Sequence, residues 1–170
     1  MPLSLYDPNL LRSALYINGK WSRPDNCSEL EIRNPVDESL ITSIPNGTRS
    51  DAKLGIQAAS NALTDWSSRP AKDRSKFLRR WHDLILANID DLAGILTAEQ
   101  GKPITEAKGE ISFGAAFFEW FAEEAKRVYG QTIPAPNADQ RLVVLKQPIG
   151  VCSAITPWNF PMAMIPRKAA

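Results

Sequence analysis

The sequence has little cysteine, one histidine and no excess of either charge. Cys27 and Cys152 stand far apart and form no CxxC or Cys/His ligand spacing, so neither a disulfide framework nor a metal site is indicated. The 20 Lys and Arg residues nearly balance 19 Asp and Glu residues, and this leaves no basic field to capture nucleic acid. We therefore expect no nucleic-acid partner and no metal, and a reducing cytoplasmic location fits best.

Long apolar runs are also absent. No window approaches the roughly 18 consecutive apolar residues that a membrane span needs, and residues 1–8 have neither a basic start nor an apolar core. We expect no membrane contact. What is present is 170 residues with 44% hydrophobic content, which is typical of a globular chain. That length suits one domain but is short for an enzyme with separate cofactor and substrate domains.

The hydrophobic pattern divides the chain into three blocks. Alternation between residues 15 and 44 predicts short antiparallel strands at Leu15–Ile17, around Trp21, at Leu30–Ile32 and at Leu40–Ile44, with Asn18-Gly19 as a hairpin turn. Helical spacing follows from residue 51 to 129 and predicts four helices. The first ends near Trp66, the second starts at Pro70, the third is capped by Asp90 and closes at Gly101, and the fourth is capped by Thr105 and runs to about Tyr129. The residues expected to face inward are Ala52, Ile56, Ala59, Leu63, Trp66, Phe77, Leu78, Trp81, Leu84, Ile85, Ile89, Leu92, Ile95, Leu96, Ile111, Phe117, Phe118, Phe121, Ala125 and Val128.

The third block predicts a hairpin and the start of a parallel sheet. Residues 131–146 have the pattern of a protruding hairpin. Val151–Ile155 are small and apolar without alternation, which is typical of an interior parallel strand covered on both faces. A turn at residues 157–161 and a helix over 162–170 would complete a strand-turn-helix unit, so the fold class is α/β. Because the sequence stops at Ala170 without a helix cap, we expect a fragment.

Asn159 lies where open α/β sheets bind ligands, between the carboxyl end of a strand and a helix. A side-chain amide at that position can donate to an oxyanion that forms on a carbonyl substrate. The alternative is an asparagine that turns the chain or caps the helix, and spacing alone favours it.

Longer segments carry a family resemblance. Val151 to Lys168, containing ITPWNFPMAMIPRK, resembles the aldehyde dehydrogenase superfamily, and within it most closely the succinate-semialdehyde dehydrogenases. Supporting segments are INGKW from Ile17, RNP from Arg33, LTAEQGKP from Leu96, EAKGEI from Glu106 and FEWFAEE from Phe118. The resemblance covers roughly residues 10 to 170 and implies the amino-terminal part of an NAD- or NADP-dependent oxidoreductase, with a semialdehyde as its small-molecule substrate.

The resemblance also implies roles for particular residues. Asn159 matches the asparagine whose amide stabilises the thiohemiacetal oxyanion, and Ile155, Thr156, Pro157 and Trp158 match the stretch that lines the nicotinamide site. Arg167 matches the arginine that holds the distal carboxylate of the substrate, whereas an ordinary solvated helix charge is the alternative. Pro166 is expected to disturb the helix before it. The hairpin at residues 131–146 matches an oligomerisation element, so a homo-oligomer is expected.

The resemblance also implies domain boundaries. Residues 1–129 are strands and helices that cover the cofactor domain, 130–148 form the oligomerisation hairpin, and 149–170 begin the NAD(P)-binding domain. The family's cysteine nucleophile, glutamate base and cofactor-binding lysine have no match in the chain, and Cys152 is expected to be inert inside an apolar strand. The segment alone is therefore expected to be inactive.

Other candidates are weaker. His82 is expected on a polar helix face, and the phenylalanine stripe around Phe118 is expected in the core. Glu99, Glu106 and Glu110 are interpreted as solvated residues or salt-bridge partners.

Two alternatives stay open. One is oxidation of glutarate semialdehyde or another aldehyde, because one extra methylene changes pocket discrimination by only about 1–3 kcal/mol. The other is a non-catalytic chain that only pairs with full-length subunits.

Overall fold

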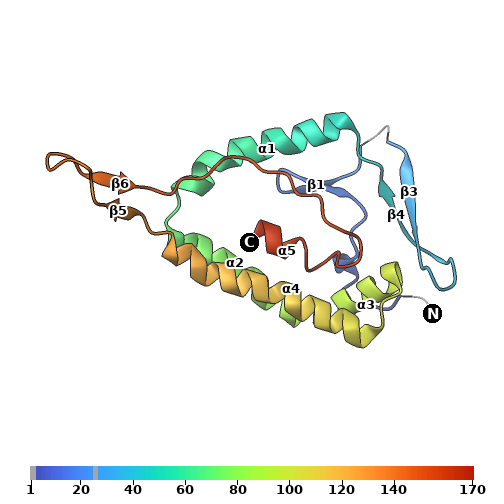
Figure 1. Ribbon diagram of the computed structural model, residues 1–170. Helices are drawn as coiled ribbons and strands as arrows, with labels where there is room; N and C mark the ends of the chain where they lie inside the picture. Colours follow the sequence, from blue (N-terminus) through green and yellow to red (C-terminus); the bar gives the residue numbers. More distant parts are fainter. Residues whose placement is uncertain (1–2, 25–26) are drawn as a thin grey trace.

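The computed structural model describes residues 3–24 and 27–170, and its amino-terminal part contains two antiparallel strand pairs (Figure 1). β1 (Leu15–Ile17) pairs with β2 (Lys20–Ser22), and β3 (Glu29–Arg33) pairs with β4 (Leu40–Pro45). Asn18 and Gly19 have φ angles of 51° and 75°, which the tight hairpin turn between β1 and β2 requires. All four predicted strands and the Asn-Gly turn are confirmed.

Four long helices follow, as the helical spacing predicts. They are α1 (Arg49–Ser68), α2 (Ala71–Ala87), α3 (Ile89–Gln100) and α4 (Ile104–Glu124). Thr48 and Asp51 form a capping box at the start of α1, and Gly101 ends α3 in the left-handed conformation with φ 75°. No helix among the described residues is long and apolar enough to cross a bilayer.

Two predicted caps and one helix end were wrong. Asp90 lies in the first turn of α3, whose cap position is Asn88, and its carboxylate lies 2.6 Å from the Lys108 ammonium. Thr105 lies inside α4, because Pro103 lacks a backbone N–H and its fixed φ of −53° starts the helix directly after it. α4 ends at Glu124 and continues only as a 3-10 turn to Arg127, short of Tyr129.

The core lies between α2, α3 and α4. Trp81 of α2 stacks on the buried Phe118 of α4 with ring centroids 4.3 Å apart. On the surface, Arg79 of α2 pairs with Glu119 of α4 at 2.8 Å and with Glu123 at 3.3 Å. The other buried apolar residues of this core are Ile85, Ala93, Leu96, Ala107, Ile111 and Ala115.

The predicted inward faces are only partly correct. Leu96, Ile111 and Phe118 are buried as expected, but α1 has no buried residue, and Phe77 and Leu84 of α2 are exposed. The apolar stripe of a helix shows which face is suited to burial, but burial also requires a partner surface, and the described chain supplies only a partial one for α1, where Trp66 lies on Phe77 with ring centroids 5.8 Å apart.

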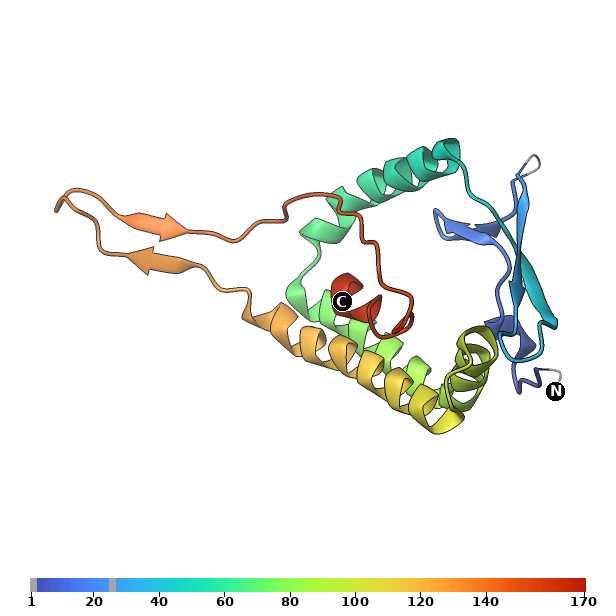
Figure 2. The same ribbon diagram turned by 45° about the vertical axis from the view of Figure 1, so that its right-hand side comes forward.

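The carboxyl-terminal part begins with the expected hairpin. β5 (Gln131–Ile133) pairs antiparallel with β6 (Leu142–Val144), and the hairpin projects away from the helices in both views (Figures 1 and 2). The chain then returns along α1 and ends in the short helix α5 (Pro166–Ala169), which packs against α4.

Two expectations for this last segment were wrong. Val151–Ile155 form no strand, and the last helix covers only residues 166–169 instead of 162–170. A strand exists only through hydrogen bonds to a neighbour, and among the described residues no strand lies beside 151–155. Pro161 and Pro166 lack the donors that a continuous helix would need, so turns replace its first part.

Candidate active site

The candidate site is the loop that follows residues 151–155, where a strand was predicted but does not form. This loop lies exposed on the surface. Ile155 is 95% exposed and Trp158 is 81% exposed, while Asn159 sits in a turn. The Asn159 side chain makes no hydrogen bond to another described residue, and the residue that caps α5 is Ile165. Asn159 therefore does not cap α5, whereas the other form of that alternative, an asparagine that turns the chain, agrees with its place in the turn.

The loop is held from the carboxyl end of α3 through its own backbone. Gln100 Nε2 donates to the Trp158 carbonyl oxygen at 2.9 Å, and Lys102 Nζ donates to the Asn159 carbonyl oxygen at 3.0 Å. The Lys102 ammonium also lies 4.4 Å from the centroid of the Phe160 ring. Two consecutive carbonyl groups of the loop are thus fixed by side chains from the EQGKP segment.

Glu110 of α4 binds the same loop from the other side. Its side chain is 1% exposed, and one oxygen pairs with Lys102 Nζ at 2.5 Å. The other oxygen accepts from the backbone N–H of Met162 at 3.0 Å and of Ala163 at 3.2 Å. Each carboxylate oxygen thus has a charged or backbone partner, as a buried charge requires.

The interpretation of Glu110 as a solvated residue was wrong, although its role as a salt-bridge partner is confirmed. A signal for its burial was present in the sequence. Glu110 lies three residues after Ala107 and four before Gly114, both buried, so helical periodicity places it on the inward face of α4. A charge on an apolar helix face indicates a buried, paired group.

Arg167 lies on α5, exposed, with its guanidinium 5.9 Å from the centroid of the Phe117 ring. No acidic side chain of the described residues forms a salt bridge with it. Pro166 occupies the first position of α5, where proline is tolerated, and turns replace the helix expected over residues 162–165, so the expected disturbance of the helix before Pro166 is confirmed.

The remaining titratable candidates lie elsewhere. His82 Nδ1 lies 2.9 Å from its neighbour Asp83 on α2, but the His82 side chain is only 14% exposed, so its expected place on a solvated polar face is not confirmed. Partial burial raises the pKa of Glu99 above its ordinary value. Cys27 lies in a loop, and Cys152 is exposed instead of buried in an apolar strand, so the stated reason for its inertness is wrong.

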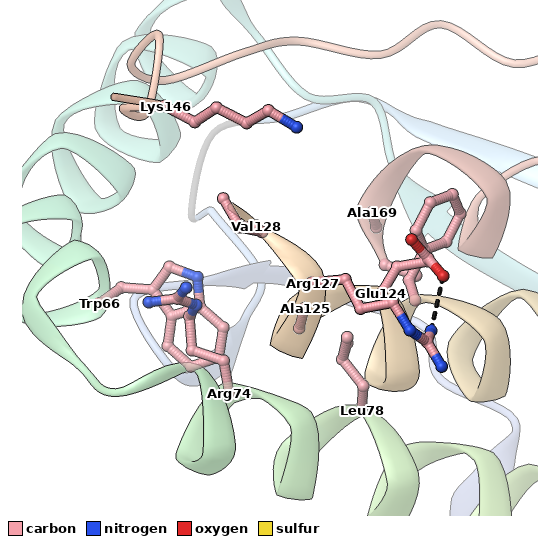
Figure 3. Close-up of a pocket in the computed structure, with 11 residues that line it drawn as sticks. Trp66, Arg74, Leu78, Glu124, Ala125, Arg127, Val128, Lys146 and Ala169 are labelled. Atoms are coloured by element: carbon pink, nitrogen blue, oxygen red, sulfur yellow. Dashed lines mark hydrogen bonds and ion pairs between the residues drawn. The ribbon is translucent and has the colours of Figure 1, made fainter. Parts of the chain in front are cut away.

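A pocket near the carboxyl end of α4 is separate from this loop (Figure 3). Arg127 and Glu124 pair there at 2.7 Å, and Lys146 extends over the space from the segment after β6. Ala169 and Ala170 line it, but none of residues 155–159 does. Its position does not connect it to Asn159.

The chain matches known proteins along nearly its whole length. The model of the aldehyde dehydrogenase family matches residues 21–170. A glutarate-semialdehyde dehydrogenase of Pseudomonas putida is 52% identical over 98% of this chain, and the succinate-semialdehyde dehydrogenase [NADP(+)] of Escherichia coli is 50% identical over 98%. The crystal structure of succinate-semialdehyde dehydrogenase from Burkholderia pseudomallei superimposes with a TM-score of 0.95 at 52% identity and covers 97% of this chain.

The chain therefore belongs to the aldehyde dehydrogenase family, and the resemblance and the α/β fold class inferred from the sequence are confirmed. It spans about a third of its relatives: 35% of each of the two curated proteins and 34% of the crystallised chain.

Proposed function

We propose that this chain forms the amino-terminal third of an NAD- or NADP-dependent oxidoreductase that oxidises succinate semialdehyde to succinate. The reaction would pass through a thiohemiacetal and a thioester on a cysteine outside residues 1–170, with a glutamate base that is also outside them. The 170 residues alone are then inactive. Residues 1–129, 130–148 and 149–170 would act as the helical cover, the oligomerisation hairpin and the start of the cofactor domain.

Asn159 is the proposed oxyanion donor. Its side-chain amide has no hydrogen-bond partner in the part of the chain that the structure describes, while its main-chain carbonyl is held by Lys102 at 3.0 Å. Electrostatic preorganisation requires a donor whose backbone is already fixed and whose amide is free, because little free energy is then needed to reorganise it when negative charge develops. This supports the role without involving Cys27 or Cys152.

Residues Ile155, Thr156, Pro157 and Trp158 are the proposed cofactor contacts. Thr156 is half-buried and the other three are exposed. Their irregular backbone fits this role, because the peptide groups of Ile155 and Thr156 make no hydrogen bond to other described residues and can contact a bound nicotinamide nucleotide. That cofactor would accept a hydride from the substrate carbon. The name of the Escherichia coli relative specifies NADP(+), and NAD is the alternative.

The proposed substrate class rests on the exposed guanidinium of Arg167. An exposed guanidinium without an acidic partner among the described residues can form a paired contact with a carboxylate. Substrates with a distal carboxylate fit, and the names of the Pseudomonas and Escherichia relatives specify glutarate and succinate semialdehyde. Glutarate semialdehyde therefore remains the alternative substrate.

The two free cysteines support the proposed cytoplasmic location.

A hybrid enzyme tests this function. It joins residues 1–170 of this chain to the remaining two thirds of the Escherichia coli relative, and the unmodified relative is the control. We expect cofactor reduction with succinate semialdehyde, and an increase of KM for that substrate of about tenfold or more in Arg167→Ala, because a charged hydrogen bond is worth about 1.5–3 kcal/mol. A preference of tenfold or more for glutarate semialdehyde would favour the alternative. Absence of aldehyde oxidation in a folded hybrid would refute the function.

We also propose that the hairpin at residues 131–146 pairs with a second subunit. Every residue of β5 and β6 is exposed, including Leu142, Val143 and Val144. An apolar two-stranded ribbon with open edges is a pairing surface unless something covers it.

Val143→Lys in the hybrid enzyme is expected to shift the enzyme from an oligomer to smaller species, because a charge would be placed in the pairing strand. Sedimentation velocity would measure the change. Ile149→Lys is the matched control, since Ile149 is 94% exposed and lies outside the hairpin. An unchanged sedimentation coefficient for Val143→Lys would remove the hairpin from the interface.

A further inference from the structure

We propose that Lys102 is a positioning residue for Asn159 and acts through the Asn159 carbonyl group. The carboxylate of Glu110 holds the Lys102 ammonium in place. Lys102 Nζ has three contacts: Glu110 Oε2 at 2.5 Å, the Asn159 carbonyl oxygen at 3.0 Å and the Phe160 ring at 4.4 Å. Two of these contacts lie in the turn at residues 159 and 160, and the third is the carboxylate on α4, so the ammonium joins the turn to that helix. The inference rests on the proposed function of Asn159 as oxyanion donor.

The described hydrogen bond of Asn159 is made by its main chain. Its side chain has no hydrogen-bond partner among the described residues, so the contacts that restrict it act through the backbone of the turn, which sets the direction in which the side chain leaves the main chain. That backbone is held on both sides, by Gln100 and Lys102 at residues 158 and 159 and by Glu110 at residues 162 and 163. An oxyanion donor must lie within hydrogen-bond distance of a defined point, and a displacement of about 1 Å can cost about 100-fold in rate.

The burial of the Lys102–Glu110 ion pair indicates that the pair positions the turn more than it stabilises the fold. The Lys102 side chain is 13% exposed and the Glu110 side chain is 1% exposed, so the carboxylate is shielded from water and the ammonium is largely shielded. A buried ion pair pays a large desolvation cost, and well-packed apolar residues often give equal or better stability. An apolar pair, however, could not bind the Asn159 carbonyl and the Met162 and Ala163 amides at the same time.

The surface of α4 is shaped to receive the same turn. A Cβ atom at Gly114 would lie 2.3 Å from the Met162 sulfur and 3.1 Å from the Ala163 Cα atom. Gly114 therefore lets the turn approach the helix closely enough for Glu110 to reach the amides of residues 162 and 163. Lys102, Glu110 and Gly114 belong to one support for the loop.

The test uses the double variant Lys102→Met/Glu110→Gln in the hybrid enzyme. It leaves no unpaired buried charge, and the glutamine oxygen can still accept from Met162 and Ala163, so the bond to Asn159 is what is lost. We expect kcat to fall about 10- to 100-fold. Lys108→Met is the control, because Lys108 pairs with Asp90 at the exposed surface, and its kcat is expected to stay unchanged.

The effect of the double substitution on kcat in the Asn159→Ala background distinguishes a positioning role from a purely structural one. If Lys102 acts through Asn159, the double substitution causes little further loss there, whereas general destabilisation would reduce kcat by the same factor in both backgrounds. Equal factors, or no loss in either background, would overturn the proposal. If the double variant does not fold, Lys102→Arg retains the charge but displaces the turn with its larger planar group, and it should show the same dependence on Asn159.

A second readout does not depend on activity. In the 170-residue chain, the carbonyl-carbon NMR resonance of Asn159 is expected to shift upfield in the double variant and to stay in place in Lys108→Met. An unmoved resonance would refute the positioning role. If the resonance shifts but the unmodified hybrid oxidises no aldehyde, the contact is supported and the proposed function fails.

Discussion

Asn159→Ala in the hybrid enzyme is expected to lower kcat by about 100- to 1,000-fold, with a much smaller change in the KM for the cofactor. This is the general cost of removing one preorganised oxyanion donor. The effect falls on kcat because the amide interacts with negative charge that develops only in the transition state. Pre-steady-state measurement of cofactor reduction would report the step directly.

The control for this prediction is Asn137→Ala in the polar turn of the hairpin. Asn137 is exposed, and its backbone carbonyl closes a turn with the Gln140 amide at 3.2 Å, so its side chain has no expected part in the reaction. If Asn159→Ala retains a kcat within a few-fold of that of Asn137→Ala, Asn159 is not the oxyanion donor.

The elements that the sequence predicted correctly depend on local interactions. The Asn18-Gly19 turn needs two residues that tolerate positive φ, and the closure of α3 at Gly101 needs one, so a few adjacent residues determine each. The β5–β6 hairpin likewise joins residues close in sequence. For such elements the surrounding chain adds little information, and pattern alone is sufficient.

Two of the wrong predictions, the strand at residues 151–155 and the buried face of α2, concern features that depend on distant partners. Val151–Ile155 have the composition of a buried parallel strand, yet no neighbouring strand lies in the described chain to supply its hydrogen bonds. The outward face of α2 around Phe77 and Leu84 likewise lacks a covering surface. Both are physically reasonable in a chain that spans 35% of its relatives, in which other segments can provide those partners.

The candidate site was located from sequence, but its support was not. The ITPWNFP segment predicts the loop by resemblance, whereas Lys102 lies in a supporting segment without a predicted role, and Glu110 is predicted only as a solvated residue or a salt-bridge partner. Their significance comes from a contact between residues separated by about 50 positions: the Met162 amide binds Glu110 at 3.0 Å. Residue types cannot reveal such a contact without coordinates, although the periodicity of α4 indicated that Glu110 faces inward.

Phe118→Ala is expected to have the largest effect on the folding of the 170-residue chain, a loss of about 3–5 kcal/mol in the free energy of unfolding. Phe118 is one of the largest fully buried side chains and stacks on Trp81, so its removal leaves a cavity between α2 and α4. A small domain is stable by only about 5–15 kcal/mol, and this loss is therefore a large fraction of the total. Urea unfolding followed by circular dichroism would measure it.

Phe113→Ala is the matched control, because it removes the same side chain from the same helix at an exposed position. Phe113 is 50% exposed and contacts Phe117 edge to face at 5.0 Å, so we expect a loss of about 1 kcal/mol or less. Equal losses at the two positions would mean that α2 and α4 do not form the stable core in solution. A much larger loss at Phe118 would show that these helices hold the support of the Asn159 loop, since Glu110 lies on the same face of α4.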